Sequence, residues 1–384
     1  MIHYIRKTAQ DAHPGDDLPV SERHKQTRHL TKDQPAADRS MSLELVTCAT
    51  DNVLMVQQSS TRLRGYASVF GFFMLVTAPM FFSAVHFVLS IGLPIKSFSH
   101  LFAVALALPF FVVTVGSIFL ALRTFRIDLL TPTDNPLVFN RKTRKVYRVM
   151  PDIPQRQGLS PAALLRHWLN TFRPWPMQVV EYDWDCLEAE YFSETMLAGN
   201  VVRTSHHLMF YVKAAPDSDR VLGCFDIVAP MLIREDGAMM FWEHIRRFMQ
   251  ENGPPLPPGE KPAPKPPRNP IAALQTVMPY FWPLFVAGFG WSAWTYVEHG
   301  LLRMSPMRFL SSGAAYDAGV LAFCVGLITF VGCWAALINW IGHLLAPTLK
   351  LPPEVLQDAG EPVDLWALWR QTKDQLGQRT NQNN

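Results

Sequence analysis

Four long stretches without a charged side chain most constrain how this chain can fold. Gly65–Ile95, Ser97–Leu122, Ile271–Val297 and Ala318–Leu349 contain no Asp, Glu, Lys or Arg. A helix needs about 20 mostly apolar residues to cross the hydrocarbon core of a bilayer, and each stretch is longer than that. A soluble core helix rarely stays uncharged on every face over such a length. The sequence therefore predicts an α-helical polytopic membrane protein with four transmembrane helices.

The spacing of these stretches predicts two helical hairpins that flank a soluble domain. The first pair is separated by a few residues, and the two pairs are separated by a long segment of ordinary soluble composition. The predicted organisation begins with a disordered tail at 1–40 and a short segment at 41–64 that could add a strand to the later domain. Hairpin 1 follows at 65–122 with helices at about 67–92 and 101–122, then an α+β domain at 123–252 and a Pro-rich linker at 253–270. Hairpin 2 occupies 271–346 with helices at about 277–297 and 319–345, and in the tail at 347–384 the segment Leu365–Trp369 could form either an interfacial helix or a docking helix.

The distribution of Lys and Arg near the ends of these helices predicts their orientation. Cytoplasmic loops carry an excess of positive residues. Ten such residues lie on the side of the central domain and three lie on the other, so both termini and the central domain are expected in the cytoplasm. The two sets are Arg62, Arg64, Arg123, Arg126, Arg141, Lys142, Lys261, Lys265, Arg268 and Lys350, against Lys96, Arg303 and Arg308.

The central segment reads as several antiparallel strands followed by one amphipathic helix. Val180–Cys186 alternates apolar and acidic residues, and the alternation changes phase at Leu187. In the closing helix, Phe241–Met249, apolar side chains share one face, while Glu243, Arg246 and Arg247 fall on a face expected to be exposed. This pattern fits a small barrel of the pleckstrin-homology type, and it also fits other α+β sandwiches.

A basic cluster near the membrane is the candidate contact surface. It lies in a predicted β-hairpin, where it could be solvated or could contact anionic lipid or a partner. A nucleic-acid reader would need base-stacking aromatic residues or a recognition helix as well, and the net charge of the whole chain is only +3, so we expect no nucleic acid. The candidate contact residues are Arg141, Lys142, Arg144, Lys145 and Arg148, together with Glu243, Arg246 and Arg247.

No motif in the sequence specifies an enzyme, a metal or a cofactor. There is no phosphate-binding Gly loop, no Gly-x-Ser-x-Gly elbow and no paired-Cys zinc spacing. Asp183 and Asp185 sit two apart on one strand and simply share a face, whereas the adjacent His206 and His207 point to opposite faces. We therefore expect a protein that is not an enzyme and has no cofactor.

Small residues four apart in the predicted spans indicate close packing between helices. Such pairs let helix backbones approach each other in a membrane. The pairs are Ala103 with Ala107, Gly288 with Ser292, Ala322 with Gly326, and Gly332 with Ala336.

Three segments resemble the signature segments of an uncharacterised family. They are Phe139–Tyr147, Tyr182–Asp185 and, most specifically, Phe241–Met249. Members of that family are bacterial polytopic inner-membrane proteins, often encoded beside type VI secretion effectors. The resemblance implies a multi-pass inner-membrane accessory or immunity-type protein of a Gram-negative bacterium, and the family supplies no catalytic residues to carry over.

The leading functional hypothesis is therefore a non-enzymatic interaction protein of the inner membrane. Its expected partners are membrane lipids and another protein, such as an effector or a secretion component, and homo-oligomers stay open. The alternatives are a small-solute channel or transporter and, less favoured, a membrane enzyme that acts on lipid or envelope precursors.

Overall fold

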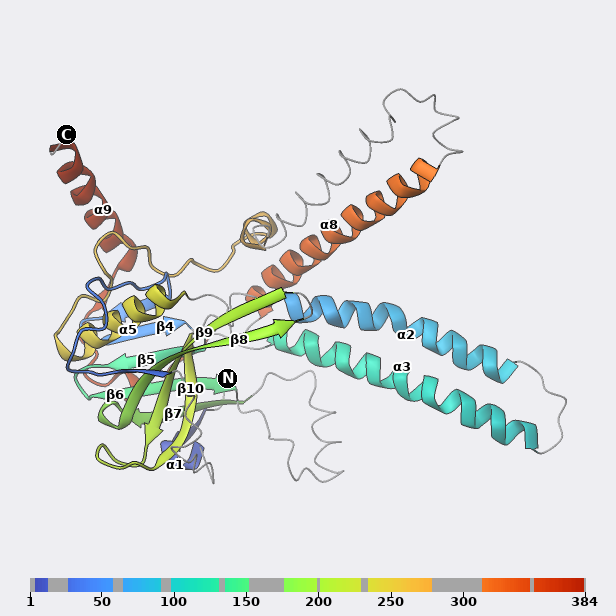
Figure 1. Cartoon of the computed structure of the whole chain (residues 1–384), viewed down its shortest axis with the longest axis horizontal. Helices are drawn as coiled ribbons and strands as arrows, with labels where there is room; N and C mark the ends of the chain where they lie inside the picture. Colours follow the sequence, from blue (N-terminus) through green and yellow to red (C-terminus); the bar gives the residue numbers. More distant parts are fainter. Residues whose placement is uncertain are drawn as a thin grey trace.

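The chain is a mixed α/β protein with two β-sheets, from which long apolar helices extend to one side (Figure 1). The computed structural model describes residues 4–12, 27–57, 65–90, 98–130, 135–151, 176–198, 201–228, 234–277, 313–345 and 349–382.

The larger sheet has seven strands in the order β1-β7-β6-β5-β4-β3-β11. All neighbours are antiparallel except β1, which pairs in parallel with β7. Both edge strands come from near the ends of the chain, so the sheet is not complete within the central segment. The strands are β1 (Tyr4–Thr8), β3 (Val46–Thr50), β4 (Val53–Gln57), β5 (Pro136–Asn140), β6 (Lys145–Pro151), β7 (Met177–Asp183) and β11 (Pro362–Val363).

The smaller sheet has four antiparallel strands in the order β10-β9-β8-β2. A 3-10 turn, η3 (Trp184–Cys186), separates β7 from β8 and carries the chain from one sheet to the other. The phase change in the sequence at Leu187 therefore marks a change of sheet. The strands are β2 (Thr27–Leu30), β8 (Leu187–Ala198), β9 (Val201–Lys213) and β10 (Val221–Val228).

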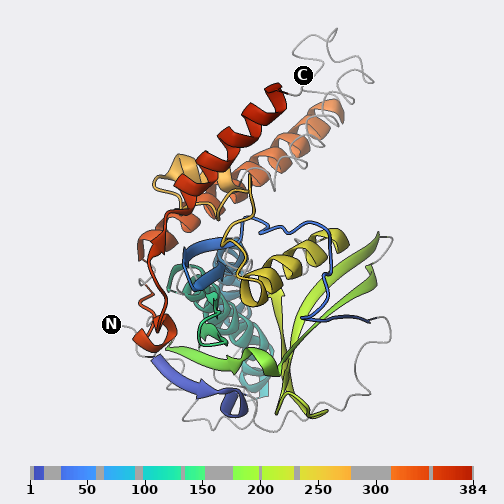
Figure 2. The ribbon, with the colours of Figure 1, turned by 90° about the vertical axis from the view of Figure 1, so that its left-hand side faces the viewer.

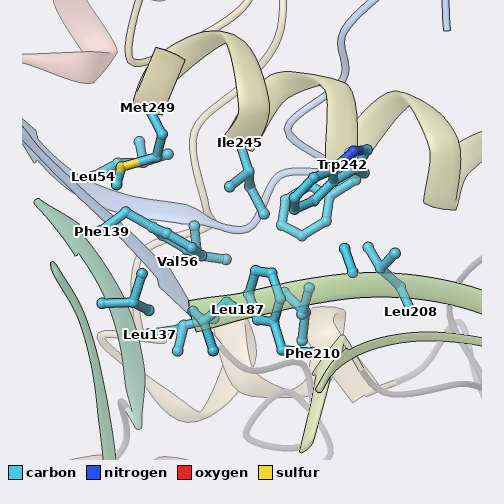
Figure 3. Packing of buried hydrophobic residues seen from close by; sticks show 14 of the residues in the cluster. Leu54, Val56, Leu137, Phe139, Leu187, Leu208, Phe210, Trp242, Ile245 and Met249 are labelled. Atoms are coloured by element: carbon cyan, nitrogen blue, oxygen red, sulfur yellow. The ribbon is translucent and has the colours of Figure 1, made fainter. Parts of the chain in front are cut away.

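The helix α5 (Glu235–Gln250) covers the core between the two sheets (Figures 1 and 2). Its side chains point onto residues of both sheets (Figure 3). Trp242 stacks on Trp184 with ring centroids 5.8 Å apart and meets Phe210 edge-on at 5.9 Å. All three side chains are fully buried. Large aromatic side chains supply much of the burial energy of such a core.

Three long helices make up the apolar part of the residues that the structure describes. The helices α2 (Tyr66–Ser90) and α3 (Phe98–Leu130) run side by side, while α8 (Gly313–Leu345) diverges from them away from the body (Figure 1). Near the body, Phe72 of α2 lies 4.7 Å from the ring of Trp334 of α8. The Ser68 N–H of α2 donates to Asp128 Oδ2 of α3 at 2.6 Å, which joins these two helices at the same end. Other described helices are α1 (Ala9–Ala12), η6 (Pro353–Leu356) and α9 (Leu365–Gln382), and residues 270–277 are also helical.

The expectation of a four-helix polytopic membrane protein with a small barrel is wrong. Among the described residues, one helical segment, Leu108–Leu130, is long and apolar enough to cross a membrane. Among the described residues of α2 and α8, the apolar stretches are shorter, Ala67–Pro79 and Thr329–Leu345. The uncharged stretches by themselves therefore do not establish four spans. The helix expected at about 277–297 lies almost entirely outside the described residues.

The expected boundaries also change, because both ends of the chain join the body. The tail expected to be disordered supplies β1 and β2, and the segment at 41–64 supplies β3 and β4. The Pro-rich segment packs on the body rather than hanging free, since the Ala263 N–H donates to Val46 O at 2.8 Å and Ser42 Oγ donates to Glu260 Oε2 at 2.6 Å. Backbone pairing across long sequence separations created this order, and local composition does not reveal such pairing.

The small-residue pairs fall in different surroundings. Gly332 and Ala336 are buried, and Ala336 packs against the helical residues 270–277. A Cβ placed on Gly326 would meet nothing within 4 Å in the part of the chain that is described. The helices α2 and α3 approach each other closely at Gly71, which is not among the predicted pairs. A Cβ added there would meet Thr124 and Ala121 of α3. The pair Gly288 and Ser292 and the side chains of Ala103, Ala107 and Ala322 lie outside the described residues.

Candidate functional site

The basic cluster surrounds the turn between β5 and β6, which Asn140 organises. Its fully buried side chain accepts the backbone N–H groups of Lys142 and Thr143, each at 3.1 Å, and donates to Gln357 O at 2.8 Å. Arg144 has φ 55°, in the left-handed region that closes such tight turns. The sequence therefore fixes a rigid loop that presents the cationic side chains in defined directions.

Two arginines of the cluster attach this turn to neighbouring elements. Arg141 lies over the Phe248 ring of α5, with its guanidinium 4.8 Å from the centroid, and donates to Gly253 O at 3.2 Å. Arg144 forms a two-point pair with Asp185, at 3.2 and 2.6 Å. The hydrogen bond from Arg144 lowers the pKa of the Asp185 carboxyl. Both partners are substantially exposed, so this pair contributes little stability.

Lys145 and Arg148 likewise lie against the sheet. Lys145 pairs with Glu181 of β7, and Arg6 of β1 reaches the other oxygen of the same carboxylate at 2.5 Å. Burial alone would raise the pKa of Glu181, but the hydrogen bonds from Lys145 and Arg6 outweigh it and lower that pKa. Arg148 lies over the Phe225 ring at 4.7 Å. These contacts use the cations to join strands.

Lys142 differs from the other members of the cluster. Its side chain is exposed and makes no hydrogen bond or ion pair to the described residues. The cluster therefore presents much less unpaired charge than its sequence suggests. Of the five cations, Lys142 is the one most available to lipid or to a partner.

The polar face of α5 is buried, which corrects the expectation that it is exposed. Glu243 is 0% exposed and Arg246 is 4% exposed. Glu243 accepts from Arg246 Nε at 2.9 Å and from Arg247 Nε at 2.6 Å, so the i,i+4 pair seen in the sequence does form. Burial favours a raised pKa for Glu243, but the bonds from both arginines and the Ala36 N–H lower it. Burial also lowers the pKa of the neighbouring His244 to about 4.

Residues 32–42 cover this face, and we call them the N-terminal strap. Arg246 Nη1 donates to Lys32 O at 3.4 Å, and Arg247 Nη2 donates to Asp38 O at 3.2 Å. Lys32 is itself held against Trp184, where its Nζ donates to the backbone carbonyl at 2.5 Å. Burial lowers the pKa of Lys32 to about 8. No local pattern predicts the strap, because it contains few apolar residues and pairs with α5 over a long sequence separation.

The structure shows no assembled site for a metal in the described part of the chain. No group of three or more His, Cys, Asp or Glu there is arranged to hold an ion. His207 and Asp226 approach within 3.4 Å, and His206 faces Tyr191 at 2.7 Å, so the two adjacent histidines have separate partners on opposite faces of β9. These groups link neighbouring strands and do not converge on one point.

The third candidate region is the apolar surface of α3. Within Leu108–Leu130, the most apolar 18-residue window has a mean hydropathy of 1.8, and 22% of that window is buried in the structure. A core helix of a soluble protein would be mostly buried. Seven large apolar side chains of α3 are instead exposed: Leu108, Phe111, Val112, Val113, Ile118, Leu120 and Ile127.

Comparison with known proteins places the chain in a family. No curated protein and no solved structure matches it significantly. The model of a family of unknown function, DUF6708, matches residues 115–355, a span that includes part of α3, most of the β body and all of α8. Because this match covers more than half of the chain, the protein belongs to the DUF6708 family of unknown function.

Proposed function

We propose that this chain is a non-enzymatic, membrane-anchored interaction protein, with α3 embedded in lipid and the β body outside the bilayer. The observation that carries the proposal is the exposed apolar surface of α3. Soluble monomers rarely expose contiguous apolar patches of this kind. Covering seven such side chains with lipid contributes on the order of 10 kcal/mol, at about 1.5–3 kcal/mol for each complete burial.

The body end of the helices fits a membrane boundary. Thr124, Arg126 and Asp128 are buried polar residues within the last two turns of α3, and Asp128 holds the first turn of α2 through Ser68. The charged residues of α3 all lie at this end, whereas Phe98–Leu122 contains none. Near α3, Arg123 and Arg126 lie at the body end and Lys96 precedes the other end, and this local excess of positive residues favours the cytoplasm as the location of the body.

The β body supports an interaction role rather than catalysis. Its acidic groups Glu181, Asp185 and Glu243 each pair with a cation that joins strands or holds the strap. A catalytic pair of carboxylates would need opposed environments inside a cleft. The exposed Lys142 and the half-buried aromatic residues at the start of α9 are better suited to contact another protein or a lipid surface.

The finer proposal follows from the resemblance of the three signature segments. It is that the protein partner is a component or effector of a type VI secretion system, and that this chain is an accessory or immunity-type protein of a bacterial inner membrane. Deleting the gene and exposing the cells to effectors of a sister strain tests the immunity form. Loss of survival against one effector is expected, and unchanged survival against all of them contradicts it.

The membrane proposal is tested by flotation of the full chain with liposomes. The chain should move with the vesicles and stay with them after an alkaline carbonate wash, which strips peripheral proteins. The matched control is the chain with charge added to the apolar face of α3, Val112→Lys together with Phe111→Lys, which should float less. A wild-type chain that stays monodisperse in detergent-free buffer contradicts the proposal.

A further inference from the structure

A cavity of about 480 Å³ lies where α8 meets the β body. Its size is within the range of pockets that hold small ligands, roughly 300–1,000 Å³. One wall comes from the strands β3 and β4, one from the Pro-rich segment 263–267, one from α8 and one from the start of α9. The lining residues on which the inference depends are Cys48, Lys265, Asn339, Asp364 and Trp366.

The cavity lies beside the apolar helices. Asn339 and His343 line it from the last turns of α8, and the next residues along that helix, Leu344 and Leu345, are strongly exposed apolar side chains. A membrane that surrounds the helices would therefore place its polar headgroup layer near the cavity. This step rests on the proposed membrane function.

Two opposite charges and an aromatic ring line the same region. The Lys265 ammonium lies over the Trp366 ring, 5.6 Å from its centroid. Asp364 caps α9, since its Oδ1 accepts the N–H groups of Trp366 at 3.0 Å and of Ala367 at 3.1 Å. A ligand that carries both an anion and a cation would complement Lys265 and Asp364 together, whereas a simple anion would meet repulsion from Asp364.

Asn339 supplies an independent indication of a ligand. Its side chain is only 2% exposed, and Oδ1 has no hydrogen-bond partner among the described residues. A buried acceptor without a donor is destabilising, and native proteins rarely leave one. Since Asn339 lines the cavity, a ligand with an N–H or O–H donor would satisfy it.

We propose that this cavity binds the headgroup of phosphatidylethanolamine. Lys265 binds the phosphate, and the primary ammonium donates to Asn339 Oδ1 with Asp364 balancing its charge. The acyl chains extend along the exposed apolar surface at Leu344 and Leu345. Phosphatidylcholine has the same phosphate and positive charge, but its quaternary nitrogen has no N–H to donate, so the site discriminates between these two lipids.

The experiment measures the protection of Cys48 from a maleimide in the detergent-solubilised full chain. The other cysteines (Cys186, Cys224, Cys324 and Cys333) are replaced by Ser, and micelles carry increasing amounts of phosphatidylethanolamine or phosphatidylcholine. We expect half-protection at a concentration of phosphatidylethanolamine about 3-fold to 10-fold lower than that of phosphatidylcholine, the change that one hydrogen bond produces. Half-protection of Cys48 at equal concentrations of the two lipids would overturn the proposal.

Two variants assign the discrimination to residues. Asn339→Leu keeps a similar volume and should abolish the preference between the lipids, while Lys265→Gln should weaken both lipids alike because it removes the phosphate contact. A thermal melt checks that each variant folds. Lys265→Gln is a surface change, so it tests the site even where Asn339→Leu does not fold. A preference that persists in folded Asn339→Leu, or unchanged binding in Lys265→Gln, contradicts the assignment.

Two further measurements are needed. One distinguishes a lipid from a soluble ligand, and the other distinguishes failure of the headgroup site from failure of the membrane proposal. Soluble phosphoethanolamine should protect Cys48 only at far higher concentrations than the lipid, and equal potency would overturn a lipid as the ligand. Flotation of the same preparation runs in parallel. A chain that floats without protection by phosphatidylethanolamine refutes the headgroup site alone, whereas a chain that does not float refutes the membrane proposal.

Discussion

The β body and the apolar helices treat the same kinds of side chain in opposite ways. In the body, Trp184 and Trp242 are 0% exposed, and the two sheets with α5 enclose them on all sides. In the helices, Val112 is 59% exposed and Leu344 is 64% exposed. Protein packing thus buries the large apolar side chains of the body but leaves those of the helices exposed. The difference indicates that a second apolar medium covers the helices, and lipid is the medium that our proposal supplies.

Polar groups show the reverse contrast. The body buries a carboxylate, Glu243, together with Arg246, and satisfies both with the strap. The exposed surface of α3 has no comparable group between Leu108 and Leu120. A body that buries paired charges, joined to a helical segment that contains no charge between Leu108 and Leu120, is consistent with a folded domain placed beside a bilayer.

Removing the central aromatic of the body should have the largest effect. Trp242→Ala leaves a cavity between α5 and the sheets, so the free energy of unfolding should fall by about 3–5 kcal/mol. Val112→Ala is the control, because its side chain packs on little protein, and it should leave the unfolding transition of the body nearly unchanged. Denaturant titration in detergent measures both. Equal losses of unfolding free energy in the two variants would contradict the difference in packing between the body and the helices.

Acid should destabilise the body through His244. Its pKa is about 4 in the folded chain against 6.5 in the unfolded chain, so the unfolded chain binds more protons between these values. The stabilisation is complete above pH 6.5 and is lost as the pH falls towards 4, by a total of about 3 kcal/mol. Melting curves across this window measure it. His244→Leu should reduce the dependence of stability on pH in this window. An unchanged pH dependence in that variant would contradict the role of His244.

Neutralising Glu243 should loosen the strap. In Glu243→Gln the buried Arg246 loses the buried one of its two acidic partners, and the free energy of unfolding should fall by about 2 kcal/mol, the scale of hydrogen bonds to charged groups. Limited proteolysis should then cut within residues 32–42 faster than in the wild type. Glu251→Gln is a matched control, because Glu251 also pairs with Arg246 but is half exposed. Cleavage that is equally fast in both variants would contradict the role of Glu243.

The smallest effect is expected at the exposed pair of the basic turn. Arg144→Gln should change the free energy of unfolding by less than about 1 kcal/mol, because both Arg144 and Asp185 are screened by solvent. The same measurement for Lys142→Gln should show no loss of stability at all. A loss of several kcal/mol in either variant would mean that the turn is held by contacts other than those described above.

Much of the secondary structure of the body could be predicted from local patterns, whereas the burial of Glu243 under the N-terminal strap could not. The β-hairpin around residues 141–144, the strand at 180–183 and the amphipathic helix 241–249 follow from alternation and helical periodicity, which depend on neighbours a few residues apart. The burial of Glu243 depends on Ala36, which lies 207 residues earlier, and no local pattern encodes that contact.

The helices illustrate a different limit. The uncharged stretches predicted the long helices α2, α3 and α8, although α8 begins before its stretch and includes Asp317. Among the described residues, one segment, Leu108–Leu130, is long and apolar enough for a span, so the absence of charge predicted helices better than it predicted spans. The lining of the proposed headgroup cavity was likewise hidden, since Cys48, Lys265 and Asn339 lie in three separate parts of the sequence.

Accessibility of one engineered cysteine in each region tests the central claim most directly. The native cysteines are replaced by Ser, and Val112→Cys and Lys142→Cys are compared in liposomes with a water-soluble maleimide. We predict that Lys142→Cys on the body reacts rapidly, while Val112→Cys on α3 stays unreactive until detergent dissolves the vesicles. Equally rapid reaction of the two cysteines in intact vesicles would show that α3 lies in water, and would contradict the account.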